Sequence, residues 1–234
     1  MMLCKWDNLP ESMRIPEVSK YFDILKHKRA SLMIKRLFDL IVSIILLIIL
    51  SPLFLIIAVA IKIDSPGPIF YRQSRITKYG VEFKIHKFRS MVKEADQNGT
   101  LVTLLDDNRI TKVGTFIRKF RLDEISQLLD VIQGTMSLVG TRPEVPKYVA
   151  SYSPEMRATL LMPAGVTSLS AIYFSQEAKL LSEAEDPDKV YVEDILPVKM
   201  KFNLESIEKF SFWRDIKILF MTLFLICGKI YSIK

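Results

Sequence analysis

An adjacent pair of acidic residues, Asp123 and Glu124, is the strongest candidate for chemistry in this sequence. The pair stands at the start of a predicted helix, residues 123–132. The basic residues nearest to it in the sequence are Lys112, Arg118, Lys119, Arg121 and Arg142. Guanidinium groups and a helix N-terminus favour the ionised form of a carboxylate beside bound phosphate. Such a carboxylate can attack phosphorus or hold a divalent cation.

The same pair also has a purely structural interpretation. Asp at a helix N-cap and Glu in the first turn complement the free N–H groups and the helix dipole. The basic residues can equally form a solvated, lipid-facing surface. Taken alone, the pair favours this structural interpretation. The sequence contains no glycine-rich phosphate loop, dinucleotide fingerprint, Ser-His-Asp arrangement or Cys/His metal spacing, which excludes most familiar enzyme classes.

The element that must position any such site is an apolar run, residues 37–61, interrupted by Ser51-Pro52. About 25 helical residues span about 37 Å, against a hydrocarbon core of about 30 Å. Pro52 offers no N–H to the carbonyl of Ile48, although the Ser51 hydroxyl can satisfy that carbonyl. Two alternatives remain open: a helix-break-helix hairpin that enters and leaves by one face, or a kinked crossing helix.

Positive charge flanks both ends of the apolar run and favours the re-entrant alternative. The basic residues are Lys26, Lys28, Arg29, Lys35 and Arg36 before the run, and Lys62, Arg72, Arg75 and Lys78 after it. Positive residues prefer the cytoplasmic side, so both ends are drawn to the same face. Asp39 follows Lys35 by one helical turn and lies at pairing distance from it.

The sequence predicts an α+β fold that is mainly helical and is divided into three parts. Residues 1–33 form a basic, amphipathic surface extension, residues 34–64 form the membrane segment, and residues 65–234 form one soluble domain. The net charge of +7 suits anionic surfaces or substrates. A nucleic-acid partner is not expected, because the basic residues scatter around a membrane anchor without interleaved aromatic residues.

Short patterns predict the elements of the soluble domain. Residues 69–75 and 81–88 form a small β-hairpin around a turn at Tyr79-Gly80. A long loop covers residues 93–108, and helices cover residues 112–120 and 123–132, the second ended by Gly134. Residues 137–146 form an extended loop. The apolar stretch 216–226 is too short to cross a membrane and is predicted to be an interfacial or buried helix.

Six motifs, in one order, make the sequence resemble a known family. They are Lys35-Arg36-Leu37-Phe38-Asp39, Ser51-Pro52, Ser65-Pro66-Gly67-Pro68-Ile69-Phe70, His86-Lys87-Phe88-Arg89-Ser90-Met91, Leu122-Asp123-Glu124 with Gln127-Leu128, and Ser137-Leu138-Val139-Gly140-Thr141-Arg142-Pro143-Glu144. Together they resemble the bacterial sugar transferases that are monotopic phosphoglycosyl transferases. The resemblance covers roughly residues 34–165 and continues more weakly to the C-terminus.

The resemblance implies transfer of a sugar-1-phosphate from a nucleotide-sugar, usually a UDP-sugar, to polyprenol phosphate. The products would be UMP and a polyprenyl-diphosphate-sugar, in the first membrane step of surface glycan or exopolysaccharide synthesis. The enzyme would act at the cytoplasmic face of the bacterial inner membrane, in contact with its lipids. Residues 34–64 would form a re-entrant membrane helix broken at Ser51-Pro52, and residues 65–234 would form a cytosolic catalytic domain at the membrane surface.

The resemblance also implies roles for individual residues. Asp123 would be the nucleophile, would form a phosphosugar intermediate and would contact Mg²⁺, and Glu124 would be required. Arg142 would bind phosphate, and Arg118 and Lys87 match basic residues near the family's site. Arg89 is a further phosphate-binding candidate on spacing alone.

Two departures from the family pattern leave the donor sugar open. Thr141 replaces the first proline of a Pro-Arg-Pro loop, and Met162 with Pro163-Ala164-Gly165 replaces an Arg-Pro-Gly sequence. The alternative function is a non-catalytic membrane scaffold of a polysaccharide assembly complex. The oligomeric state is also open, a homo-oligomer included.

Overall fold

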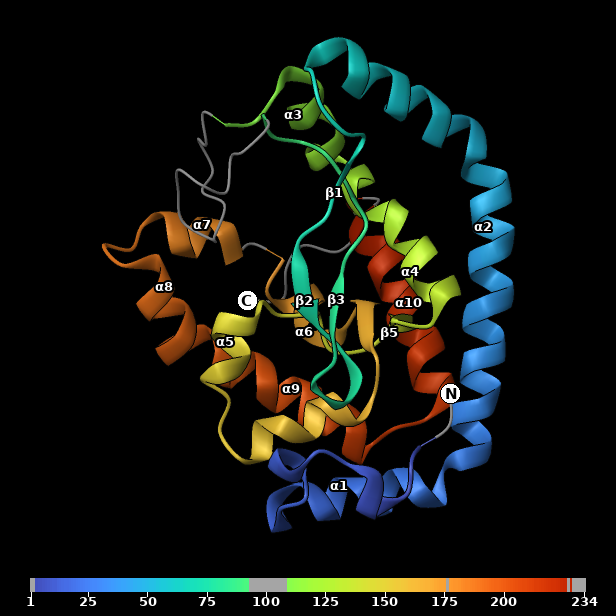
Figure 1. The fold of residues 1–234 in the computed structure, drawn as a ribbon, viewed down its shortest axis with the longest axis vertical. Coiled ribbons are helices and arrows are strands. Elements are labelled where there is room, and N and C mark those ends of the chain that lie inside the picture. The colour runs from blue at the N-terminus through green and yellow to red at the C-terminus, as the bar shows by residue number, and fades with distance from the viewer. Residues whose placement is uncertain (1–2, 93–108, 176, 227, 229–234) are drawn as a thin grey trace.

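The computed structural model describes residues 3–92, 109–175, 177–226 and 228, so the predicted loop at residues 93–108 lies outside the described residues. The described chain is mostly helical with short strands, which confirms the α+β, mainly helical prediction, and one long helix, α2, runs along its side (Figure 1). The helices are α1 Pro16–His27, α2 Arg29–Asp64, α3 Lys112–Lys119, α4 Leu128–Gln133, α5 Pro146–Ala150, α6 Leu169–Tyr173, α7 Glu177–Ser182, α8 Pro187–Val190, α9 Leu196–Glu208 and α10 Phe212–Ile226. The strands are β1 Phe70–Tyr71, β2 Ser74–Ile76, β3 Glu82–Lys84, β4 Lys87–Phe88, β5 Met136–Val139 and β6 Ala164–Thr167.

Helix α2 continues through Ser51 and Pro52, so the predicted break into two separate helical arms is wrong. The helix bends instead, and Figure 1 shows its upper part turning over the domain. The Ser51 hydroxyl donates a 2.8 Å hydrogen bond to the carbonyl of Ile48, the group that Pro52 leaves without an N–H donor. This bond confirms the predicted role of Ser51 and explains why the helix continues through Pro52. By length and composition α2 can cross a membrane.

Both halves of α2 contact the same folded domain. The first half contributes Phe38, Val42, Leu47 and Leu50 to a cluster with buried residues of α4 and β5. The second half contributes Leu53, Phe54, Ile57 and Ile61 to a cluster with Phe88 and Ile117. The opposite side of the helix stays exposed and apolar, as Ile48, Ile49 and Leu55 illustrate with exposures of 65–67%. Helix α2 therefore has a protein-facing side along both halves and an uncovered apolar side.

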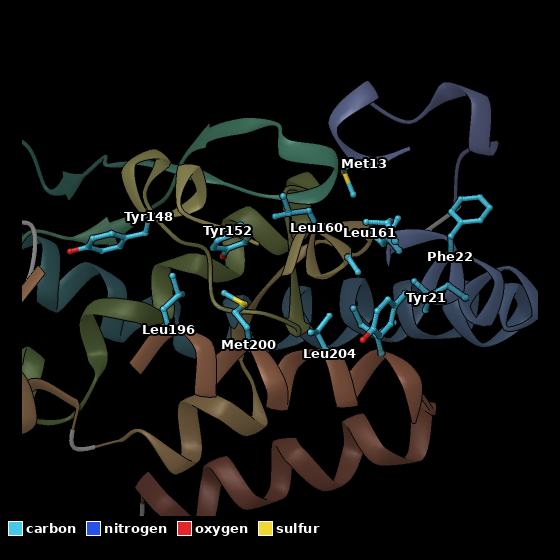
Figure 2. Close-up of a cluster of buried hydrophobic side chains, with 14 of the residues drawn as sticks. Met13, Tyr21, Phe22, Tyr148, Tyr152, Leu160, Leu161, Leu196, Met200 and Leu204 are labelled. Carbon is cyan, nitrogen blue, oxygen red and sulfur yellow. The ribbon is translucent and has the colours of Figure 1, made fainter. Parts of the chain in front are cut away.

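The N-terminal residues belong to the largest core, whereas the sequence predicted a surface extension. Val18, Tyr21, Phe22 and Leu25 are buried on one face of α1, and Figure 2 shows Met13, Tyr21 and Phe22 beside Leu161 and Leu204 of the later chain. The amphipathic pattern of α1 was visible in the sequence. Its apolar face covers protein, because α9 and the helical turn Glu155–Leu161 lie against it.

The predicted β-hairpin is confirmed, but it is divided into two short antiparallel pairs. Strands β2 and β3 pair with Arg75 opposite Phe83, and β1 pairs with β4 with Phe70 opposite Phe88. The turn lies at Lys78–Gly80, where Tyr79 has φ 61°. Between the two pairs, the side chain of His86 binds Asp130 and contacts Arg72. These side-chain contacts coincide with the interruption of the strand ladder.

Strands β5 and β6 form a parallel pair that the sequence did not predict, since residues 137–146 were expected to be an extended loop. Met136 is opposite Ala164, and Val139 is opposite Thr167. The chain segments approach so closely that a Cβ atom on Gly165 would lie 2.1 Å from the backbone nitrogen of Gly140. Backbone bonds from Gly140 to Thr167 (3.0 Å) and from Gly165 to Thr141 (2.8 Å) extend the pairing. The chain that follows β5 therefore starts from a fixed position.

The C-terminal helix α10 begins at Phe212, four residues before the predicted start. Ile218 is buried against the domain, while Trp213, Phe220, Leu223 and Phe224 are exposed. Helix α10 contacts α2, α6 and the β5–β6 pair. It is a partly covered helix with an exposed apolar side, and its placement at a lipid interface stays a prediction.

Candidate active site

Asp123 and Glu124 lie on a short 3-10 helix, Leu122–Gln127, and not on the predicted α-helix 123–132. The α-helix α4 begins only at Leu128 and is ended by Gly134, as predicted, which adopts a left-handed conformation. Arg121 precedes the 3-10 helix with φ 54°, and no side chain caps it. Asp123 is therefore not an N-cap, whereas Glu124 does lie in the first turn, as the structural interpretation expected. Both carboxylates have charged partners.

Asp123 is buried and forms an ion pair with Lys87. Its Oδ2 lies 2.9 Å from Lys87 Nζ, and the two side chains are 7% and 25% exposed. Lys87 belongs to β4, which lies against the 3-10 helix because Ser126 Oγ donates a 3.0 Å hydrogen bond to the carbonyl of His86. The predicted nucleophile and one predicted phosphate ligand are thus in direct contact.

Glu124 lies among three cations. Its Oε1 accepts a 2.5 Å hydrogen bond from Arg142 Nη2 and lies 3.8 Å from Lys87 Nζ, and its Oε2 lies 3.9 Å from Arg121 Nη1. Burial raises the pKa of Glu124, but the charges of Arg142, Lys87 and Arg121 outweigh burial and hold this pKa well below its usual range. Glu124 in turn raises the pKa of Arg142. The pair is fully ionised at neutral pH.

A buried pair, His86 and Asp130, links the start of β4 to α4. The carboxylate of Asp130 accepts hydrogen bonds from the backbone N–H of His86 at 2.9 Å and from His86 Nδ1 at 2.7 Å. Asp130 is on α4, so this pairing ties the helix that follows the acidic pair to the strand that carries Lys87. Ser126 and Asp130 thus both bind His86, and these contacts hold the 3-10 helix with Asp123 and Glu124 against the strand with Lys87.

The loop that carries Arg142 is fixed by a second buried network. Glu144 Oε1 accepts a 2.6 Å hydrogen bond from Tyr191 Oη and lies 3.5 Å from Lys199 Nζ. Arg75 Nη1 donates a 3.0 Å hydrogen bond to the carbonyl of Pro143. These contacts hold the chain after Arg142, and the 2.8 Å backbone bond from Gly165 to the carbonyl of Thr141 holds it before. The Arg142 side chain itself is 35% exposed. Arg142 can meet a ligand without leaving Glu124.

Arg121 is a site residue that was not among the predicted ligands. It lies two residues before Asp123 in the sequence, its side chain is 50% exposed, and its Nη1 lies 3.9 Å from Glu124 Oε2. Arg118, which was predicted, is half-buried near the end of α3. Within the described residues its guanidinium forms no ion pair or hydrogen bond, while α3 contacts the 3-10 helix that carries Asp123. Its role in phosphate binding stays a prediction.

Arg89 does not belong to the site, contrary to the prediction from spacing. Its guanidinium is buried and donates hydrogen bonds to the carbonyl of Pro66 at 2.8 Å and that of Ser65 at 2.7 Å, with a longer bond to Ile61 at 3.3 Å. A buried guanidinium can satisfy several carbonyls at once. Arg89 therefore binds the chain where α2 ends and does not face the acidic pair.

We expect Arg89→Gln to lower the free energy of unfolding by about 2 kcal/mol, because the shorter side chain leaves buried carbonyls without donors. The Michaelis constant for the nucleotide-sugar that the family resemblance implies as substrate should stay within about twofold, since Arg89 contacts no site group. Thermal unfolding in detergent and steady-state kinetics measure the two effects. A large rise in the Michaelis constant with unchanged stability would restore the phosphate-binding interpretation.

The acidic pair suits a divalent cation that substrate phosphates help to hold. No group of three or more His, Cys, Asp or Glu side chains within the described ranges can hold a metal ion. Mg²⁺, however, is commonly bound by one or two carboxylates together with substrate phosphates and water. Asp123 and Glu124 fit that donor set. Binding of Mg²⁺ at Asp123, which the family resemblance implies, stays a prediction.

The two departures from the family pattern lie behind the Arg142 loop. Thr141 and Met162 both line a small cavity of about 30 Å³ between the end of β5 and helices α6, α9 and α10. Met162 also packs against the largest hydrophobic core. In this chain the methionine therefore contributes to the core and cavity wall behind the loop.

These features define a class of protein: a helix-rich domain bound to one long apolar helix, with a buried carboxylate pair neutralised by lysine and arginine. The chain belongs to the bacterial sugar transferase family, whose model matches residues 30–229.

Curated relatives agree with this assignment. The chain is 34% identical over 193 residues, 81% of its length, to the UDP-N-acetylgalactosamine-undecaprenyl-phosphate N-acetylgalactosaminephosphotransferase of Aeromonas hydrophila. It is 36% identical over 197 residues, 82% of its length, to the UDP-glucose:undecaprenyl-phosphate glucose-1-phosphate transferase of Escherichia coli (strain K12). A transferase of the latter name from Caulobacter vibrioides is 34% identical over 191 residues, 80% of the chain. The matches span 43%, 40% and 67% of these relatives.

Proposed function

We propose that this protein transfers a sugar-1-phosphate from a UDP-sugar to polyprenol phosphate, releasing UMP and forming a polyprenyl-diphosphate-sugar. The observation that carries the proposal is the Asp123–Glu124 pair held by Lys87 and Arg142, 2.9 Å and 2.5 Å from their carboxylate partners. The names of the relatives supply the substrate class, because each names a transfer to undecaprenyl phosphate. The reaction would be the first membrane step of surface glycan or exopolysaccharide synthesis.

The site chemistry supports a two-step transfer through Asp123. In the first step an Asp123 carboxylate oxygen forms a bond to the phosphorus next to the sugar, the bond from that phosphorus to the bridging oxygen breaks, and UMP leaves. In the second step a phosphate oxygen of polyprenol phosphate attacks the same phosphorus and the bond to Asp123 breaks. Both substrates then use one site in turn, which gives ping-pong kinetics.

The basic residues suit this chemistry. Arg142 and Arg121 are partly exposed beside the pair, so they can neutralise charge on the transferring phosphoryl group and on the departing UMP. Lys87 holds the Asp123 carboxylate before substrate binds. Mg²⁺, bound by Asp123 with Glu124 nearby, would further neutralise phosphate charge.

We also propose that α2 enters and leaves the bilayer by the cytoplasmic face. Its first half contacts α4 and β5, and its second half contacts the β4 region and α3, all within one domain. A straight crossing would carry one half away from that domain. The uncovered apolar sides of α2 and α10 would face lipid. This arrangement supports placement of Asp123 near the depth of a lipid phosphate.

Single cysteines at His27 and Ile63, in a chain whose Cys4 and Cys227 are replaced by Ser, test this topology. Both positions are exposed, one before α2 and one near its end. We expect an impermeant maleimide to modify both in inverted membrane vesicles and neither in intact spheroplasts. A cysteine at exposed Asp194 serves as the reference for the catalytic domain. Modification of His27→Cys and Ile63→Cys from opposite sides would mean a crossing helix.

The decisive experiment for the reaction is a donor panel. Membrane-extracted protein is incubated with Mg²⁺, polyprenol phosphate and a series of UDP-sugars, and the nucleotide product is identified. UMP release with one donor supports the proposal and names the sugar. Release of UDP alone would mean a different transfer. Normal glycan synthesis in cells that carry only Asp123→Ala would instead favour the non-catalytic scaffold.

A further inference from the structure

The N-terminal part of α2 contacts the two elements that adjoin the site, α4 and β5. Arg36 Nη1 donates a 2.6 Å hydrogen bond to the carbonyl of Val131, and Arg36 Nη2 donates a 3.1 Å bond to that of Ile132. Both carbonyls lie in the last turn of α4, where carbonyls lack intrahelical donors. Arg36 therefore fixes the helix that follows directly after the Asp123–Glu124 turn.

Asp39, one turn further along α2, contacts the other segment. Its Oδ2 accepts a 2.6 Å hydrogen bond from Ser137 Oγ on β5, and Ser137 is fully buried. Strand β5 leads through Gly140 to Arg142. Lys35 completes the group, with Nζ 3.9 Å from Asp39 Oδ2 and 2.6 Å from Asp215 Oδ2 on α10. The side chains of Lys35 and Asp39 are only 1% and 2% exposed.

If α2 were only packed against the domain by apolar contacts, the buried charges of Lys35 and Asp39 would not be needed. Placing an ammonium and a carboxylate in a buried interface carries a desolvation cost, and such groups commonly fix one arrangement more than they add stability. Here the polar contacts come from one side of one helix and reach two segments, α4 and β5. Glu124 precedes the first and Arg142 follows the second, and these two residues meet at 2.5 Å.

We infer that Arg36 and Asp39 are positioning residues, which set the Asp123–Glu124 turn against Arg142 by holding α4 and β5 to the membrane helix. The inference rests on the proposed function and deepens it, because it assigns α2 a part in catalysis beyond membrane attachment. A shift of about 1 Å in a catalytic group can cost about 100-fold in rate, so the position of these two segments matters.

The test compares Arg36→Gln with Arg29→Gln. Both changes remove one positive charge from the same flank of the apolar run, so any effect of flank charge on membrane orientation is matched. Arg29 is exposed, and its side chain forms no hydrogen bond or ion pair within the part of the chain that the structure describes. Asp39→Asn is compared in the same way with Asp23→Asn on α1, where the side chain is exposed.

We expect Arg36→Gln and Asp39→Asn to lower kcat for UMP release by about 10-fold or more, with KM for the UDP-sugar within about twofold. Arg36→Lys, which keeps a donor for α4, should recover part of the loss. The controls should match the wild type. A lower melting temperature with unchanged kcat per folded enzyme would overturn the inference, because it would show a purely structural role.

Hydrogen exchange of the detergent-extracted protein provides a readout that needs no activity. Arg36→Gln should speed amide exchange in α4, and Asp39→Asn should speed it in β5, while the control variants should not. Unchanged exchange in both segments would overturn the inference even in an active enzyme. If the wild type releases no UMP, the proposed function fails, and exchange still decides whether Arg36 and Asp39 hold the two segments.

Discussion

Replacing Asp123 with Asn is expected to reduce UMP release by on the order of 10⁴-fold, which is the scale of losing a nucleophile that acts through a covalent step. The amide has nearly the shape of the carboxylate but no charge and little nucleophilicity. Lys87 loses its ionic partner at 2.9 Å, yet its side chain is 25% exposed and can be hydrated. The fold should therefore persist while the first step fails.

Two measurements separate this result from unfolding. Asp194→Asn is the matched control, because it makes the same change at an exposed position of the same domain. Mass spectrometry of the wild type, incubated with the UDP-sugar alone, should show a sugar-phosphate adduct on the peptide that contains Asp123. Full activity of Asp123→Asn, or an adduct on another residue, would remove Asp123 from the role of nucleophile.

Arg142→Ala should lower kcat/KM by on the order of 10²- to 10³-fold, the usual range for removing one donor that stabilises transition-state charge. The change removes a phosphate ligand and also leaves Glu124 buried with a weaker set of cations. Arg142→Lys should retain part of the activity, since it keeps the charge but loses the bidentate geometry of a guanidinium. Kinetics with both variants distinguish charge from geometry.

The pH profile gives a second test of Arg142. The pKa of Glu124 lies below its ordinary value of 4.5 in the folded protein, so its ionised form stabilises the fold above that pH. This stabilisation is lost as pH falls from 4.5 toward the folded pKa. Burial raises the pKa of Glu124, and Arg142 is the strongest opposing charge, so Arg142→Ala must raise it. The acid limb of the activity profile should then move to higher pH, and an unmoved limb would mean that Glu124 ionisation is not limiting.

Local patterns were enough to predict much of the helical structure. The predicted helix at residues 112–120 matches α3 to within one residue. Gly134 was predicted to end the following helix, and it does so with φ 91°. The hairpin turn at Tyr79-Gly80 followed from its residue types. The continuity of α2 was not predictable in the same way, since a proline favours a break and only the contact from Ser51 to Ile48 shows how the helix tolerates it.

The sequence predicted most of the residues of the site but not the contacts between them. Asp123, Glu124, Lys87 and Arg142 come together as the motifs implied. Lys87 and Arg89 were indistinguishable by spacing, and only the fold directs one to Asp123 and the other to the end of α2. The β5–β6 pair joins segments more than twenty residues apart in four-residue strands, too short to produce a recognisable pattern.

The burial of α1 has a consequence for the order of events during synthesis. Tyr21 donates a 2.8 Å hydrogen bond to Glu155, and α1 lies against α9, which begins at Leu196. During synthesis, α1 and the apolar α2 therefore emerge from the ribosome well before the residues that cover α1 have been made. Long-range contacts of this kind form late, and uncovered apolar surface invites aggregation in the meantime. Early association of α2 with the membrane would hold the unfinished N-terminal segment at a surface until its partner helix emerges.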